Sequence, residues 1–260
     1  MFGALLRHYR ELAELSQEAL GLKIGFSKSQ VAMVERGHRP PKGDFVPKAD
    51  SATGAKGALI AAALKLKFSH LASWFAPFAD EEAKCVARYE YESSTVPGLL
   101  QTEAHAYALH RAACPPLDDD EIDRLVAGRL ARQALLTRRP PVDVSFVLEM
   151  SALTRPIGGR KVHRAQLQHL LDLGELRNVS IQVMSPHRET HVGLNGPFVL
   201  LETVDRRRLA YLEVQGQNFL VSEQPQLGIL FSTYGMLRTH AHGLEESREL
   251  IKQTAKDYEH

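Results

Sequence analysis

Apolar residues recur at helical spacing through the first part of the chain. Residues 3–15 carry one stripe of five apolar side chains, namely Leu5, Leu6, Tyr9, Leu12 and Ala13. A second helix is expected over 17–24, because the Ser16 hydroxyl suits an N-cap and Glu18 suits the positive end of a helix. The pattern therefore predicts that the chain begins with two consecutive short helices.

A third helix follows after a tight corner. Gly25 suits the left-handed backbone of such a corner. Ser27 and Gln30 have the S-x-x-Q spacing of a capping box, which marks the start of the helix. Gly37 and the prolines at 40–41 mark its end. Two short helices joined by so short a turn predict a helix-turn-helix.

Polar side chains gather at the front of this third helix. In a helix-turn-helix, the first turn of the second motif helix points at base edges in the major groove, and Lys28, Ser29 and Gln30 occupy that turn. Met33, one turn later, suits contact with a thymine methyl group. The side chains expected to contact phosphates are Gln17, Arg36, Arg39 and Lys42. The pattern predicts contact with double-stranded DNA, and ordinary surface helices of a larger helical domain are the alternative.

The run LSQEALGLKIGFSKSQVAMVERGHRPP, residues 15–41, resembles the Xre-type, phage-repressor-like helix-turn-helix. The resemblance covers about residues 3–65. It implies that Glu35 is the acid of the family's E-x-G pattern and that Arg10, on the first helix, is its structural ion-pair partner. The sequence departs from the family pattern at residues 21–23, which lengthen the segment before the turn, and at Pro47, inside the next expected helix.

Two domains are expected, with a boundary after residue 67. Residues 42–67 predict a short helix, a corner over 51–57 and an Ala-rich helix that suits close packing or a dimer surface. From Phe68 a helical pattern runs to the turn at 96–98. Further helices are expected over 118–139, 161–174, 226–241 and 244–258, and strands over 142–149, 179–184, 197–202, 209–214 and 218–221. The expected fold is an all-α helix-turn-helix head, 1–67, followed by an α+β domain, 68–260, with helices first and then a small sheet backed by helices.

Charge is distributed unevenly, although the net charge is only +1. Residues 1–75 hold 11 Lys+Arg and 6 Asp+Glu, a balance of +5, and the rest holds 21 and 25, a balance of −4. This distribution predicts that contact with a polyanion is confined to the head. No apolar run approaches the roughly 20 residues of a membrane span, and the two cysteines are too few for a disulfide framework. A cytoplasmic protein without membrane contact is expected.

The second domain also resembles a known module, the antitoxin-like C-terminal domain of unknown function found behind Xre heads in actinobacteria. The string VPGLLQT, residues 96–102, is the most distinctive part of that resemblance, which extends from Trp74 to about residue 258. It implies a transcriptional regulator whose second module binds a signal or a partner, such as a small companion protein encoded nearby. By residue type alone, VPGLLQT suits either the edge of a partner groove or a helix-to-helix corner with two core leucines.

Catalytic and metal-binding patterns are weak. His187 and His191 have ligand spacing but fall in an expected loop, and Gly158-Gly159-Arg160-Lys161 lacks the spaced glycines of a phosphate-binding loop. The G-x-S-x-G pattern is absent. We therefore expect no enzyme, no cofactor and no metal, and a homodimer that binds an operator. An antitoxin-like protein that sequesters a small companion and autoregulates its operon is the alternative, and a metal-dependent sensor or enzyme is a further rival.

Overall fold

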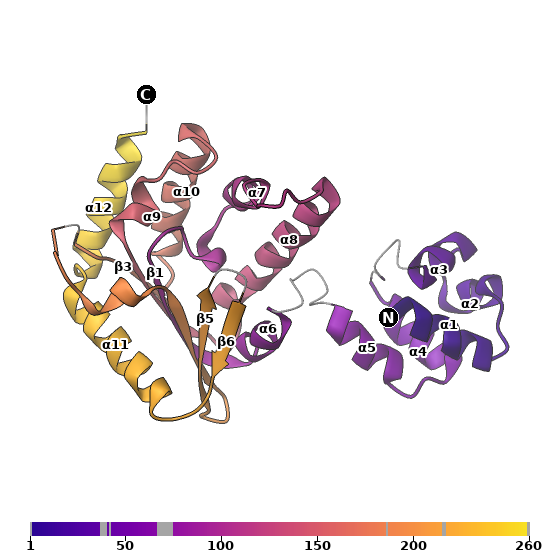
Figure 1. The fold of residues 1–260 in the computed structure, drawn as a ribbon. Coiled ribbons are helices and arrows are strands. Elements are labelled where there is room, and N and C mark those ends of the chain that lie inside the picture. The colour runs from indigo at the N-terminus through magenta and orange to yellow at the C-terminus, as the bar shows by residue number, and fades with distance from the viewer. Residues whose placement is uncertain are drawn as a thin grey trace. The chain divides into compact units, whose positions relative to one another are not determined.

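The computed structural model describes residues 2–36, 41, 43–66, 75–185, 187–214 and 217–258. Several residues singled out above, Gly37, Arg39, Pro40, Lys42, Phe68 and Trp74, lie outside these ranges. The chain divides into two compact units, Met1–His70 and Leu71–His260 (Figure 1). Among the described residues, no helix is both long enough and apolar enough to cross a membrane.

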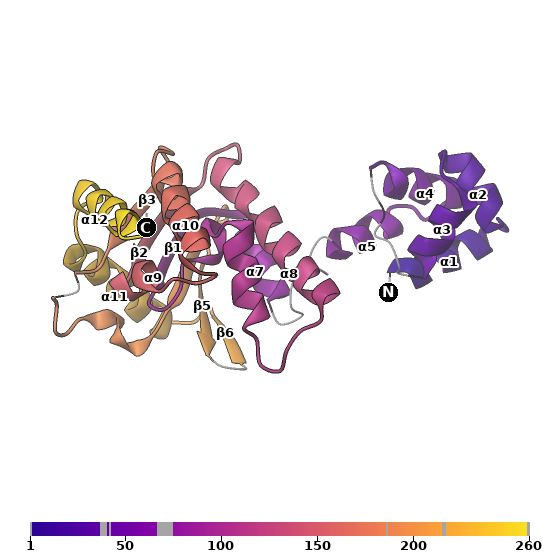
Figure 2. The ribbon, with the colours of Figure 1, turned by 90° about the horizontal axis from the view of Figure 1, so that it is seen from above.

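The described residues of the first unit form five helices, which lie together in one group (Figure 2). They are α1 (Phe2–Leu12), α2 (Gln17–Ile24), α3 (Lys28–Glu35), α4 (Phe45–Thr53) and α5 (Ala58–Leu66). Their shared core contains Leu6, Leu20, Val31, Phe45 and Leu59, each at most 1% exposed. Pro47 lies in the first turn of α4, where its missing N–H breaks no helical hydrogen bond. The unit is therefore all-α, as expected.

The second unit contains a six-stranded mixed sheet. Three parallel strands, β1 (Cys85–Glu92), β2 (Asp143–Leu148) and β3 (Val179–Val183), form one half. The antiparallel strands β4 (Phe198–Thr203), β5 (Arg208–Val214) and β6 (Gln217–Val221) form the other. The strand order is β3-β2-β1-β4-β5-β6, so β3 and β6 are the outer strands.

Helices cover both faces of this sheet. Leu167 of α10 (Arg160–Leu173) and Ile251 of α12 (Leu244–Lys256) share one core with Phe146 of β2. Leu237 of α11 (Gln226–His240) belongs to a separate core with Val147, the next residue of β2. Successive strand residues point to opposite faces, so α11 lies across the sheet from α10 and α12. The expected α+β fold is confirmed.

The remaining elements of this unit lie around the sheet. Two longer helices follow β1, namely α7 (Glu103–Arg111) and α8 (Asp119–Arg132). The short elements are α6 (Ala76–Glu82), η1 (Gly98–Leu100), η2 (Gln133–Thr137), α9 (Met150–Thr154) and η3 (Val192–Asn195). Asp118 caps α8 by accepting a hydrogen bond from the Glu121 N–H at 2.7 Å, so the acidic run at 118–121 opens a helix as expected.

One expectation is wrong: residues 85–92, taken as helical, form the central strand β1. The charged residues of this segment suggested an exposed helix. Arg88 and Glu90 are nevertheless buried and form an ion pair, in which Arg88 Nη1 lies 2.6 Å from Glu90 Oε2. Arg88 also contacts Glu82 at 2.9 Å. Charged residues inside a central strand need such partners, and the linear sequence does not reveal them.

The VPGLLQT string forms a corner between β1 and α7. Leu99 and Leu100 are fully buried, and the Thr102 hydroxyl caps α7 by accepting from the His105 N–H. Gln101 lies in a buried network in which its amide donates to the Val96 carbonyl at 2.6 Å. Of the two interpretations open from sequence, the structure shows a corner with two core leucines, but this corner joins the strand β1 to α7 and not two helices.

Candidate nucleic-acid interface

The corner between α2 and α3 is built by capping groups and glycines. The Ser16 hydroxyl accepts from the Ala19 N–H at 3.0 Å at the start of α2. Gly25 ends that helix with φ of 80°, the left-handed region that glycine adopts without strain. The chain then turns so closely that a Cβ on Gly21 would lie 2.6 Å from the Phe26 carbonyl oxygen. Residues 21–23, where the sequence departs from the pattern that it resembles, therefore lie in the last turn of α2, and Gly21 permits the close return.

A complete capping box holds the start of α3. The Ser27 hydroxyl accepts from the Gln30 N–H at 3.2 Å, and the Ser27 N–H donates to Gln30 Oε1 at 2.9 Å. Gln30 was expected to contact a base. Its carbonyl oxygen is instead occupied by the cap, so its side-chain NH₂ is the group that remains for DNA.

Opposite sides of α3 have opposite character. Val31 and Val34 face the core, with exposed fractions of 0% and 4%. Lys28 and Ser29 are exposed in the first turn, and Met33 is half-buried one turn later. Lys28 Nζ lies 3.5 Å from Glu18 Oε2, but both side chains remain about two-thirds exposed, so this pair constrains Lys28 little.

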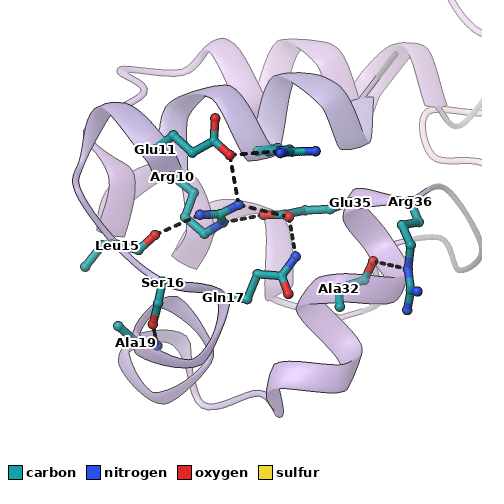
Figure 3. Close-up of polar contacts among 10 residues, drawn as sticks. Arg10, Glu11, Leu15, Ser16, Gln17, Ala19, Ala32, Glu35 and Arg36 are labelled. Atoms are coloured by element: carbon teal, nitrogen blue, oxygen red, sulfur yellow. Dashed lines mark hydrogen bonds and ion pairs between the residues drawn. The ribbon is translucent and has the colours of Figure 1, made fainter.

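Arg10, Gln17 and Glu35 converge beneath the two motif helices (Figure 3). Arg10 donates from Nε to Glu35 Oε1 at 2.5 Å and from Nη2 to Oε2 at 3.1 Å, a two-pronged contact. The side chains are 9% and 3% exposed, respectively. Arg10 Nη1 also donates to the Leu15 carbonyl, which ties α1 to the start of α2. The hydrogen bond to Glu35 raises the pKa of Arg10, so the guanidinium stays charged. Its contacts join α1 to α3 and to the segment that leads into α2.

Gln17 has a role that the sequence pattern did not indicate. Its side-chain amide donates to Glu35 Oε2 at 2.7 Å and points inward (Figure 3). The phosphate contact expected of Gln17 stays a prediction, and it would have to use the backbone N–H at the helix start, because the side-chain amide is bound to Glu35. No periodicity or spacing reveals this contact, because it joins residues 18 apart in sequence through the tertiary fold.

Arg36 lies apart from this cluster (Figure 3). Its Nε donates to the Ala32 carbonyl at 3.2 Å, and the side chain is exposed at the end of α3. A guanidinium has further donors beyond that one, so Arg36 retains donors for a phosphate. Arg39 and Lys42, the other expected phosphate contacts, lie outside the described residues.

A second unpredicted feature is the approach of α1 to α3. A Cβ on Gly3 would lie 2.2 Å from the Glu35 carbonyl oxygen, so only glycine allows the two backbones to meet there. Arg10 and Gly3 both lie on α1 and both contact Glu35. The rear of α3 is thus held by α1 while its front turn stays exposed.

The weak metal-binding pattern noted in the sequence, His187 and His191, lies in the described residues of the second unit. Among the described residues, no group of three His, Cys, Asp or Glu side chains is placed to hold a metal ion. His187 lies exposed in a loop, whereas the buried His191 ring lies 3.2 Å from Glu149 through Nε2 and accepts from the Gly193 N–H through Nδ1. Both ring nitrogens of His191 are occupied by the protein. His191 of the histidine pair noted in the sequence therefore holds the segment that leads into η3.

Comparison with known proteins yields two family matches. A helix-turn-helix domain matches residues 1–63. A domain of unknown function, DUF5753, matches residues 75–253. No curated protein and no solved structure matches the chain. The helix-turn-helix match includes α2 and α3, and the second match covers the whole sheet of the second unit.

Proposed function

Because the chain belongs to the DUF5753 family and carries a helix-turn-helix domain ahead of that region, we propose that it is an Xre-type transcriptional regulator. It reads a double-stranded operator as a cytoplasmic homodimer and catalyses no reaction. Its DUF5753 domain binds a signal or a partner protein. The DNA-binding part of this proposal follows from the geometry of α3, and the role of the second unit follows from its sequence resemblance.

One observation carries the DNA-binding proposal: α3 is held rigidly from behind while its front turn is exposed. Arg10 and Gly3 hold the rear of the helix through Glu35. Lys28 and Ser29 project from the first turn, where donors reach base edges in the major groove. A reading helix needs this combination, since a mobile helix loses the geometry on which base discrimination depends.

The test is selection of bound duplexes from a genomic fragment pool, followed by affinity measurements on the enriched duplex and a random one. The double variant Lys28→Ala/Ser29→Ala should lose about 1–3 kcal/mol of preference for the enriched duplex. Gln30 is left intact because its substitution would also break the capping box.

Lys48→Ala is the matched control. Lys48 is an exposed lysine on α4 of the same unit and pairs with Asp44, the residue before that helix. This control removes the same charge without touching α3. An unchanged preference in the double variant, or an equal loss in the control, would contradict the assignment of the reading turn.

The rival function is that of an antitoxin-like protein that sequesters a small companion. The resemblance of residues 96–102 to that group favours it. Tagged full-length protein purified from its native host distinguishes the two. A small protein retained in equal amount indicates sequestration, whereas isolation of the chain with DNA but without such a protein indicates a regulator that responds to a signal.

A further inference from the structure

The two outer strands of the sheet, β3 and β6, differ in whether other segments cover their outer edges. The edge of β3 is covered near its end, where the Val183 carbonyl accepts from the His242 N–H at 2.9 Å. The Val183 N–H donates to the Ser247 hydroxyl at 2.9 Å, and Met184 forms an antiparallel bridge with Ala241. The segment between α11 and α12 therefore satisfies backbone groups that would otherwise face outward.

At Phe219, Leu220 and Val221, the edge of β6 has no such cover among the described residues. β6 pairs with β5 alone, and no other backbone hydrogen bond to Phe219, Leu220 or Val221 is made within the described chain. The β5–β6 register runs without a bulge, in contrast to the irregularity between β1 and β4. The five residues of β6, QNFLV, include no charge and no proline. Three devices that stop an edge strand from pairing, namely charge, proline and a bulge, are thus absent from the described residues of β6.

Exposed apolar side chains flank this edge on both faces of the sheet. Phe219 is 48% exposed and lies opposite Leu212, on the face covered by α11. Leu220 is 45% exposed and lies opposite Tyr211, on the other face. A strand added beside β6 would cover both side chains and also pair the outward backbone groups.

We propose that β6 is the dimer interface, where β6 of a second copy pairs antiparallel and extends the sheet across a two-fold axis near Phe219. The choice of a second copy rests on the proposed function, because helix-turn-helix proteins read two-fold operators as dimers. Charge also supports it. A two-fold contact brings each residue near the axis close to its own copy, where like charges repel, and β6 is uncharged.

Full-length protein without DNA is the material for the test. Sedimentation over a concentration series should show a dimer, and Phe219→Lys should raise its dissociation constant about tenfold or more, because two lysines then meet near the axis. Leu220→Lys should act in the same direction. Ile229→Lys is the control, since Ile229 is 61% exposed on α11, and it should remain dimeric. A monomeric wild type, or a Phe219→Lys variant as dimeric as the control, overturns the proposal.

Cross-linking keeps the test decisive if the lysine variants unfold. In a Cys114→Ser background, which removes the exposed native thiol, Phe219→Cys should be joined to its copy by a short bis-maleimide, and Ile229→Cys should not. The reverse result overturns the proposal. Selection of an operator from a genomic fragment pool is measured in a separate experiment. A dimer that selects an operator but is not joined through β6 contradicts this interface alone, and a β6-linked dimer that selects none contradicts the DNA-binding part of the proposed function alone.

Discussion

Glu35 is the residue on which the geometry of the head depends most. The Glu35 carboxylate accepts hydrogen bonds from Arg10 through both oxygens and from the Gln17 amide through Oε2. The backbone of Glu35 also lies against Gly3. The resemblance to Xre-type heads indicated the Arg10–Glu35 pair from the sequence. The contacts of Gln17 and Gly3 with Glu35 depend on how α1, α2 and α3 meet, and the spacing of residues does not show them.

Glu35→Ala should destabilise the first unit by about 3–5 kcal/mol, because it leaves Arg10 buried without its partner. Thermal unfolding of the full chain, followed by circular dichroism, measures the change. Glu11→Ala is the control: Glu11 contacts the same Arg10 but is about half exposed, so its loss should cost at most about 1 kcal/mol. Equal melting curves for wild type and Glu35→Ala would show that the buried pair contributes nothing.

At the scale of elements, segment ends were easier to predict from the sequence than buried charges. Serines at 16 and 27 marked the starts of α2 and α3 because a hydroxyl cap is a local signal. β1 was missed because the partners of Arg88, on α6 and on β1 itself, make a charged residue compatible with a central strand. Alternation of strand residues alone could not establish that Arg88 is buried.

The contact between α7 and α10 should make the second unit sensitive to acid. His105 of α7 and His163 of α10 are fully buried, with ring centroids 6.4 Å apart. Within the part of the chain that the structure describes, neither His105 nitrogen has a hydrogen-bond partner, nor does Nδ1 of His163. Burial lowers the pKa of His105 to about 4, with smaller contributions from His163 and Arg129, and burial also lowers the pKa of His163. Both rings are therefore neutral in the folded state near pH 7.

The unfolded chain takes up protons at its histidines below about pH 6.5, whereas folded His105 resists until about pH 4. Stability is therefore present above pH 6.5 and is lost as the pH falls from 6.5 toward 4. Burial acts oppositely on Glu92, whose pKa it raises to about 7, so the comparison needs a variant. His105→Met should lose less stability than wild type between pH 7 and pH 5 in urea unfolding. Equal losses of unfolding free energy between pH 7 and pH 5 in the two proteins would contradict the role given to His105.

At the scale of the whole molecule, each unit closes a core of its own. Leu20 lies in the core of the first unit and Leu201 in that of the second, and both are fully buried. The change in composition and charge near residue 70 indicated this division from the sequence. The same signals did not indicate which outer strand of the sheet is covered, because His242 and Ser247 reach β3 only through the tertiary fold.

Leu20→Ala and Leu201→Ala should each cost about 2–5 kcal/mol, but in different transitions. Scanning calorimetry of the full chain should resolve two unfolding steps, and each variant should lower the midpoint temperature of only one step. The variants serve as each other's control. A single step that both substitutions shift equally would show that the two units unfold as one.

Separate cores also determine how the protein tolerates sequence change. A substitution on the exposed turn of α3 alters what the first unit recognises without repacking the sheet, and a change around β6 leaves the recognition turn intact. Under the proposed function, selectivity for DNA and response to a signal or partner can then diverge independently among related proteins. Exchange of the first unit between such proteins would accordingly combine one operator preference with another protein's response.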